Sequence, residues 1–121
     1  SHVHHIVSNI AGTLRPEVDT EAVFRAVFPG GTITGTPKIR AMEIIAELEP
    51  VSRGSYTGSL GWISFDGNLD FNIIIRSLEW SKGQVHVQAG AGIVADSDPQ
   101  LEYAETLEKA KAMLSAVEWS G

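Results

Sequence analysis

Apolar residues recur at helical spacing in two segments of the first half of the chain. Residues 19–28 carry an apolar stripe and begin with Asp19, a good N-cap. Residues 36–49 repeat this spacing, and Thr36 and Pro37 are residue types typical of a cap and a first helical position. We therefore expect two consecutive helices there, joined by a loop rich in glycine and threonine.

Strand-like patterns lie on either side of these helices. Residues 3–14 are rich in β-branched and apolar side chains and predict a strand or a strand pair. Residues 56–65, 69–80 and 84–90 are separated by short Asp-Gly-Asn and Ser-Lys-Gly turn sequences and predict a three-stranded antiparallel meander. The expected fold class is α+β, an antiparallel β-sheet covered by helices.

A last helix is predicted after Asp98, a natural N-cap, and Pro99, which suits the first helical position. At about 100° per residue, Glu102, Glu105 and Lys109 fall in one narrow arc of this helix. The side expected to face the core carries Leu107, Ala110, Leu114 and Val117. Two carboxylates one turn apart can share a divalent cation such as Mg²⁺, but the same spacing also favours an exposed ion pair between Glu105 and Lys109.

Composition excludes several classes of protein. A chain of 121 residues can form one small domain, and its net charge of −6 argues against a general nucleic-acid binder. The absence of cysteine excludes disulfides, thiolate zinc sites and a cysteine nucleophile. No apolar run approaches the length of a membrane span. We expect a cytoplasmic protein.

Several polar groups together suggest a site for a small, multiply anionic ligand. Positive charge or hydrogen bonds are offered by Thr32, Lys38, Tyr56, Arg76, Gly90, Gly92 and Lys109. Arg76 follows an apolar run, where a guanidinium either reaches past the edge into water or grips a carboxylate. Glu102 and Glu105 would repel an anion unless a cation lies between them and the ligand. A carboxylate ligand held through Mg²⁺ resolves that conflict.

Five stretches resemble, in the same order, the C-terminal third of the chorismate-utilising enzymes. They are residues 5–8 (HIVS), 28–45 (FPGGTITGTPKIRAMEII), 67–70 (GNLD) with Arg76, 89–97 (AGAGIVADS), and 102–106 (EYAET) with Lys109. This family includes anthranilate synthase component I, aminodeoxychorismate synthase component I, isochorismate synthase and salicylate synthase. Thr34 and residues 71–73 are more similar to the p-aminobenzoate branch, whereas residues 87–99 resemble the anthranilate branch equally well.

The resemblance implies roles for individual residues. Glu102 and Glu105 resemble the C-terminal acidic pair of a Mg²⁺ site that holds the ring carboxylate of chorismate. His5 resembles the catalytic histidine beside the ring substituent that leaves or is protonated. Thr32 resembles a hydroxyl that lines the pocket.

The remaining substrate-binding roles follow from the same resemblance. Tyr56 and Arg76 resemble the pair that grips the enolpyruvyl carboxylate of chorismate. Gly90 and Gly92 resemble backbone donors of the same pocket, and Lys109 resembles the lysine near the ring carboxylate.

Enzymes of this family are several times longer than 121 residues. The region of the catalytic lysine and the upstream pair of metal-site glutamates have no counterpart here. We therefore expect residues 1–121 to be the C-terminal part of a chorismate-binding catalytic domain. The chain also begins without Met, inside a predicted strand, and whether Ser1 and His2 are native is left open.

Such a fragment is expected to be inactive alone, to expose apolar surface and to self-associate. The partners implied for the parent enzyme are chorismate and a glutamine amidotransferase subunit that supplies ammonia. The other class of function left open is a non-catalytic binding or assembly module.

Overall fold

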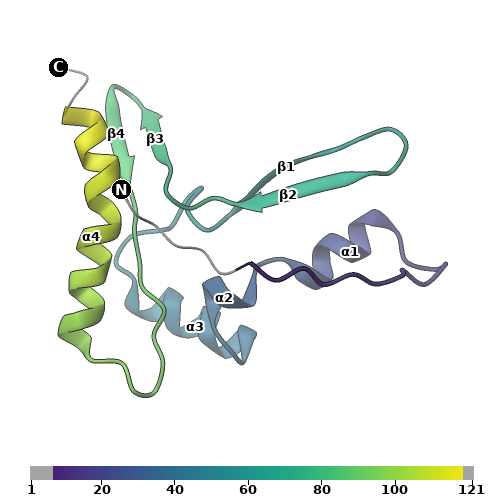
Figure 1. Ribbon diagram of the computed structural model, residues 1–121, viewed down its shortest axis with the longest axis horizontal. Coiled ribbons are helices and arrows are strands. Elements are labelled where there is room, and N and C mark those ends of the chain that lie inside the picture. The colour runs from purple at the N-terminus through teal and green to yellow at the C-terminus, as the bar shows by residue number, and fades with distance from the viewer. Residues whose placement is uncertain (1–6, 119–121) are drawn as a thin grey trace.

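The computed structural model describes residues 7–118, which form helices and short strands in an open arrangement (Figure 1). The elements are α1 (Thr20–Val27), α2 (Gly31–Thr34), α3 (Lys38–Leu48), β1 (Ser59–Ile63), β2 (Leu69–Ile73), β3 (Leu78–Ser81), β4 (Gln84–Val87) and α4 (Pro99–Glu118). Helix α4 stands beside β4 at one end of the molecule, and the β1–β2 hairpin extends from the other side as an arm. This mixture of helices and antiparallel strands confirms the α+β class.

The strands form two separate antiparallel hairpins. In the first, Ser59 of β1 pairs with Ile73 of β2, and in the second Leu78 of β3 pairs with Val87 of β4. The predicted three-stranded meander is therefore wrong, because residues 69–80 do not form one continuous strand. The break falls at residues 74–77, where Arg76 has a φ of 54° and turns the chain out of the extended conformation.

The strand predicted for residues 3–14 is absent from residues 7–14, the part of that segment that the structure describes. Val7 and Ile10 are 86% and 93% exposed. A strand is stable only when a neighbouring strand satisfies its backbone hydrogen bonds, and residues 7–14 pair with no strand in the described part of the chain.

Local signals set the helix boundaries. Asp19 caps α1 as predicted, because its side chain accepts a hydrogen bond from the Ala22 amide at 2.8 Å. Helix α3 begins one residue later than predicted, and its cap position is Pro37, which makes no side-chain capping bond. The prediction of Thr36 as the cap is wrong, because Pro37 keeps an extended backbone with ψ of 134°. Asp98 caps α4 as predicted and accepts bonds from the amides of residues 100 and 101, each at 3.0 Å.

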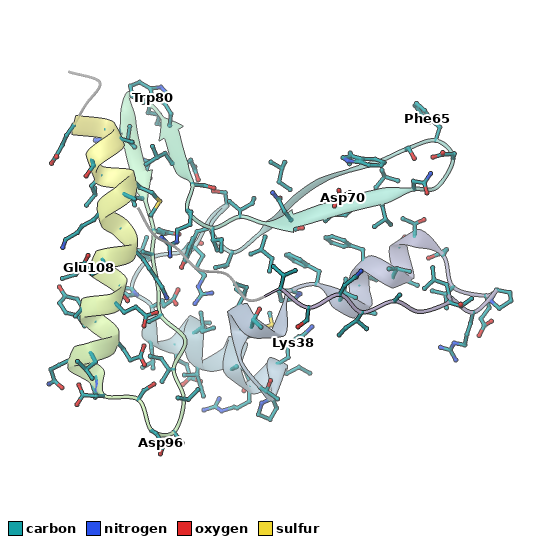
Figure 2. All side chains as sticks on the ribbon, in the orientation of Figure 1. Lys38, Phe65, Asp70, Trp80, Asp96 and Glu108 are labelled. Atoms are coloured by element: carbon teal, nitrogen blue, oxygen red, sulfur yellow. The ribbon has the colours of Figure 1, made fainter. Side chains whose placement is uncertain are left out.

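The described residues bury very little apolar surface. Met113 of α4 is the one hydrophobic residue among them that is buried. The accessible surface is 10335 Å², whereas a compact protein of 13.0 kDa would expose about 6,300 Å². Phe65, at the tip of the β1–β2 arm, points away from the rest of the molecule (Figure 2). The described residues therefore pack as separate pairs of neighbouring elements and do not form one central hydrophobic core.

Helix α4 turns a different face inward from the one predicted. Leu107 and Leu114, expected in the core, are each 49% exposed, and Met113 is buried instead. Polar contacts explain this orientation, because Lys109 and Glu102 of the same arc bond to the segment between β4 and α4. Within residues 7–118, no helix is both long and apolar enough to cross a membrane.

Candidate functional site

A cavity of about 220 Å³ lies where α2, the loop before β1, the link from β2 to β3, the segment after β4 and α4 come together. Its lining includes Thr32, Tyr56, Arg76, Gly90, Gly92 and Lys109. These are all six of the residues proposed above to bind substrate, although the elements that carry them are far apart in sequence. Lys38, at the start of α3 (Figure 2), does not line the cavity.

Two residues of the cavity wall have left-handed backbone conformations that non-glycine residues rarely adopt. Thr57 has a φ of 65° and Arg76 a φ of 54°. For a β-branched residue such as Thr57 this conformation is strained, and it persists only where surrounding contacts hold it. Such strain is found preferentially at binding and catalytic sites. The two conformations therefore mark this wall as a candidate functional site.

The two glycines of the wall differ in what surrounds them. A Cβ atom added to Gly90 would lie 3.1 Å from the hydroxyl oxygen of Tyr56, so the tyrosine closes tightly over this backbone. A Cβ atom on Gly92 would meet nothing within 4 Å. The space above Gly92 is thus open for a ligand to approach its backbone.

Lys109 brings a positive charge to the cavity from α4. Its ammonium group donates a hydrogen bond to the Gly90 carbonyl at 3.1 Å and forms an ion pair with Glu105, one turn earlier. Its side chain is 28% exposed. The ion pair predicted from spacing is therefore present, and the same lysine also reaches the cavity.

Glu102 and Glu105 stand near the cavity without lining it. Glu102 accepts a hydrogen bond from the Ser97 hydroxyl at 2.6 Å, and Glu105 is paired with Lys109. Among the residues that the structure describes, no group of three or more His, Cys, Asp or Glu side chains is placed to hold a metal ion. The two carboxylates have the oxygen chemistry that Mg²⁺ prefers, so they fit part of such a site and would need further ligands.

Sequence patterns did not identify the three further polar residues of the wall, Arg53, Thr57 and Gln88. Gln88 donates from its side-chain nitrogen to the Ser52 carbonyl at 3.2 Å, while its side-chain oxygen is buried without a hydrogen-bond partner among the described residues. A buried acceptor without a partner is uncommon and indicates a missing donor such as a ligand or water. No pattern in the sequence indicates Arg53 as a cavity residue, because it lies in the loop after α3, where the helical spacing of ion pairs does not apply.

Two larger hollows, of about 590 and 580 Å³, adjoin this cavity. Of the six proposed substrate-binding residues, Tyr56 is the one that also lines them. Arg53 is the one lysine or arginine that lines them, and each also contains a glutamate, Glu49 in the first and Glu79 in the second, so neither hollow concentrates positive charge for a multiply charged anion. The predicted catalytic residue His5 lies outside the described residues, so its place relative to the cavity stays a prediction.

Comparison with known proteins gives consistent matches over nearly the whole chain. Residues 1–115 match the family model described as chorismate binding enzyme. The aminodeoxychorismate synthase component 1 of Bacillus subtilis is 55% identical over 120 residues, which are 99% of this chain and 26% of that protein.

Relatives that carry another name are equally similar. An anthranilate synthase component I-like protein of Synechocystis is 58% identical over 118 residues, which are 98% of this chain and 24% of that protein. The anthranilate synthase component 1 of Acinetobacter calcoaceticus is 52% identical over 120 residues, which are 99% of this chain and 24% of that protein. The chain thus spans about a quarter of the length of these curated relatives.

Proposed function

The chain belongs to the chorismate-binding enzyme family, and from that premise we propose that it is the part of a longer chorismate-aminating synthase that holds the carboxylates of the substrate. The observation that carries this proposal is the cavity in which Tyr56, Arg76, Lys109 and two glycines meet. Its volume of about 220 Å³ is below the range of about 300–1,000 Å³ usual for small-molecule sites. This size suits half of a pocket whose other wall comes from elsewhere in the synthase.

Arg76 and Tyr56 bind the enolpyruvyl carboxylate of chorismate in this proposal. A guanidinium donates two parallel hydrogen bonds to a carboxylate, and a phenolic hydroxyl adds a third donor. The open backbone at Gly92, where a Cβ atom would meet nothing within 4 Å, lets the ligand approach the main chain closely. Charge-assisted bonds of this kind fix the orientation of a rigid dicarboxylate as well as holding it.

Lys109 serves the second, ring carboxylate in this proposal, which its contact with the cavity backbone at Gly90 supports. Glu102 and Glu105 would hold Mg²⁺ together with ligands from the rest of the synthase, and the bound metal would neutralise the ring carboxylate and orient it. Glu105 is paired with Lys109 in this structure. We propose that metal and substrate exchange these partners, so that Lys109 turns from Glu105 to the ligand.

The reaction we propose is replacement of a ring hydroxyl of chorismate by an amine. The carbon–oxygen bond to the hydroxyl breaks, a carbon–nitrogen bond to ammonia forms, and the hydroxyl leaves as water. His5 is the proposed acid that gives the leaving hydroxyl its proton, in line with the common use of histidine in general acid catalysis. A separate glutamine amidotransferase subunit is the proposed source of ammonia.

We favour 4-amino-4-deoxychorismate as the product, which makes the parent an aminodeoxychorismate synthase component I of the p-aminobenzoate and folate branch. Thr34 and residues 71–73 support this choice. Anthranilate synthase component I is the second candidate, because several of the similar relatives carry that name. The products differ, since anthranilate formation also releases the enolpyruvyl group as pyruvate.

The test is to incubate the purified full-length synthase with chorismate, Mg²⁺ and ammonium, and to identify the products by mass spectrometry. We expect a product that has exchanged hydroxyl for amine and keeps the enolpyruvyl group. Anthranilate with pyruvate would assign the second candidate. Binding of chorismate without turnover would instead support the non-catalytic module, and no interaction with chorismate would overturn the proposal. The 121-residue chain alone is expected to be inactive.

A further inference from the structure

We infer that Arg53 is a positioning residue of the cavity, which holds Tyr56 in place through Glu49 and Thr57. This inference rests on the proposed function, because the effect of replacing Arg53 is measured as a change in chorismate binding. None of the roles assigned above by resemblance involves Arg53. Arg53 nevertheless lines the cavity, and its guanidinium bonds to Glu49 at the end of α3 and to Thr57.

Glu49 anchors the guanidinium of Arg53 at the end of α3. The Nε atom of Arg53 donates to Glu49 Oε2 at 2.8 Å and its Nη2 atom donates to Glu49 Oε1 at 2.5 Å, so the ion pair is bidentate. This hydrogen bonding holds the pKa of Glu49 below its ordinary value of 4.5 and raises the pKa of Arg53. Both groups stay charged at neutral pH, so the anchor is permanent there.

Burial distinguishes this ion pair from the other arginine pairs of the described residues. The Arg53 side chain is 24% exposed, whereas Arg25 in its pair with Glu21 is 76% exposed. The two pairs have the same order and spacing, since the glutamate precedes the arginine by four residues in each. Partly buried charges interact more strongly than exposed ones, so Arg53 is more firmly fixed than Arg25.

From this anchor Arg53 reaches Thr57, the strained residue of the wall. Its Nη1 atom donates to Thr57 Oγ1 at 3.3 Å, and the Thr57 amide donates to the Ile74 carbonyl at 2.8 Å. A β-branched residue at a φ of 65° needs such contacts to stay there. Arg53 therefore helps to hold the backbone bend that follows Tyr56.

Arg53 also contacts Tyr56 directly. Its guanidinium carbon lies 5.9 Å from the centre of the Tyr56 ring, and the Tyr56 amide donates to the Arg53 carbonyl at 3.0 Å. A cation at this distance from an aromatic face is attracted to it. The far end of the ring, its hydroxyl, is the group that closes over Gly90. Glu49, Arg53 and Thr57 thus form a chain of contacts that ends at a proposed substrate donor.

A double-mutant cycle with Tyr56 tests this inference in the full-length synthase. Arg53→Gln, Tyr56→Phe and the double variant would be compared by KM and kcat for chorismate. We expect Arg53→Gln to raise KM about tenfold with little change in kcat, as for loss of uniform binding. In the Tyr56→Phe background the same change should raise KM less than about threefold, because coupled residues are not additive.

Two further variants complete the experiment. Arg25→Gln removes the arginine of the matched exposed pair and should change KM less than about twofold. If thermal melting shows that Arg53→Gln does not fold, Thr57→Gly replaces it in the cycle. Glycine accepts a positive φ and removes the hydroxyl that Arg53 holds, and it should show the same dependence on Tyr56.

The inference is overturned if the variant used in the cycle leaves KM unchanged, or if it raises KM equally with and without the Tyr56 hydroxyl. Either result in an active synthase would leave the proposed function standing. A wild-type synthase that neither binds nor consumes chorismate would instead defeat the proposed function. The two failures are therefore distinguishable.

Discussion

Single residues of the cavity combine unusual backbone conformations with the chemistry of anion binding. Arg76 illustrates this most directly, because its φ of 54° falls at the break between β2 and β3 and the residue lines the cavity. The two alternatives left open by the sequence were an edge arginine and a carboxylate clamp. Arg76 lines the same cavity as Tyr56 and Lys109, which favours the clamp.

Replacing Arg76 by glycine should separate stability from binding. Glycine relieves a left-handed strain of about 1 kcal/mol and adds a similar entropic cost of about 0.5–1 kcal/mol, so the melting temperature should hardly change. Loss of hydrogen bonds to a charged partner, about 1.5–3 kcal/mol, should raise KM for chorismate more than tenfold. Thermal melting and steady-state kinetics of the full-length synthase measure the two effects.

Lys82→Gly is the matched control for that substitution. Lys82 has a φ of 50° in the turn between β3 and β4 and does not line the cavity. The Lys82→Gly variant should keep both its melting temperature and its KM for chorismate near the wild-type values. An Arg76→Gly synthase with unchanged KM would contradict the clamp.

Gly92→Ala should weaken chorismate binding without affecting the fold. The added methyl group meets nothing within 4 Å in the structure, so the melting temperature should stay constant. The methyl group would occupy space at the cavity wall. We therefore expect the affinity for chorismate to fall about tenfold, which corresponds to about 1.4 kcal/mol of binding free energy. Isothermal titration with chorismate and Mg²⁺ checks this, and equal affinity of the variant would show that the ligand lies elsewhere.

At the scale of elements, helices and strands were not equally predictable. Asp19 and Asp98 act within their own helix ends, so sequence alone located those caps. The cap of α3 was misplaced because Pro37 keeps an extended backbone. The strand over residues 69–80 was wrong because nothing local in the sequence indicates the positive φ of Arg76. The strand predicted for residues 3–14 is absent from residues 7–14, because strand formation depends on a partner distant in the sequence.

The inward face of α4 was also misjudged, although the arc of Glu102, Glu105 and Lys109 was identified correctly. Hydrogen bonds from Lys109 to the Gly90 carbonyl and from Ser97 to Glu102 orient this arc toward the cavity. Hydrophobic spacing alone cannot anticipate such polar contacts between elements. The same reason explains why Arg53 and Gln88 were missed as cavity residues.

Glu105→Ala is the prediction that belongs to α4. In the 121-residue chain it should remove one ion pair and cost only about 0.2–0.5 kcal/mol of helix stability. In the full-length synthase it should abolish activity, because a proposed metal ligand is lost. Thermal melts and product assays measure the two effects.

Glu108→Ala provides the comparison for α4. Glu108 lies on the outer side of the helix, pairs with Lys111 and is 66% exposed (Figure 2). This variant should lose equally little stability and keep full activity. A large loss of stability from Glu105→Ala alone would show that Glu105 has a structural role in place of a metal-binding one.

At the scale of the whole molecule, exposed apolar surface is the main feature. Trp62 and Trp80 are 54% and 73% exposed, and Phe65 at the tip of the β1–β2 arm is fully exposed. Soluble monomers rarely leave so many large apolar side chains in water. In the proposed synthase this surface would be covered by the remainder of the polypeptide.

The 121-residue chain by itself should therefore self-associate. Among residues 7–118 its two hairpins pair with no further strand, and aromatic side chains are exposed; both favour contacts between copies. Static light scattering over a range of concentrations should show a mass that rises with concentration. A constant monomeric mass would indicate that the chain shields this surface without a partner.

The central claim is that Tyr56, Arg76, Gly92 and Lys109 form the carboxylate-binding wall of a chorismate pocket. A crystal structure of the full-length synthase with chorismate and Mg²⁺ tests it most directly. We predict the enolpyruvyl carboxylate between the Arg76 guanidinium and the Tyr56 hydroxyl, with the ring carboxylate near Lys109 and a metal ion held by Glu102 and Glu105. Chorismate bound at another site, with this cavity filled only by solvent, would contradict the account.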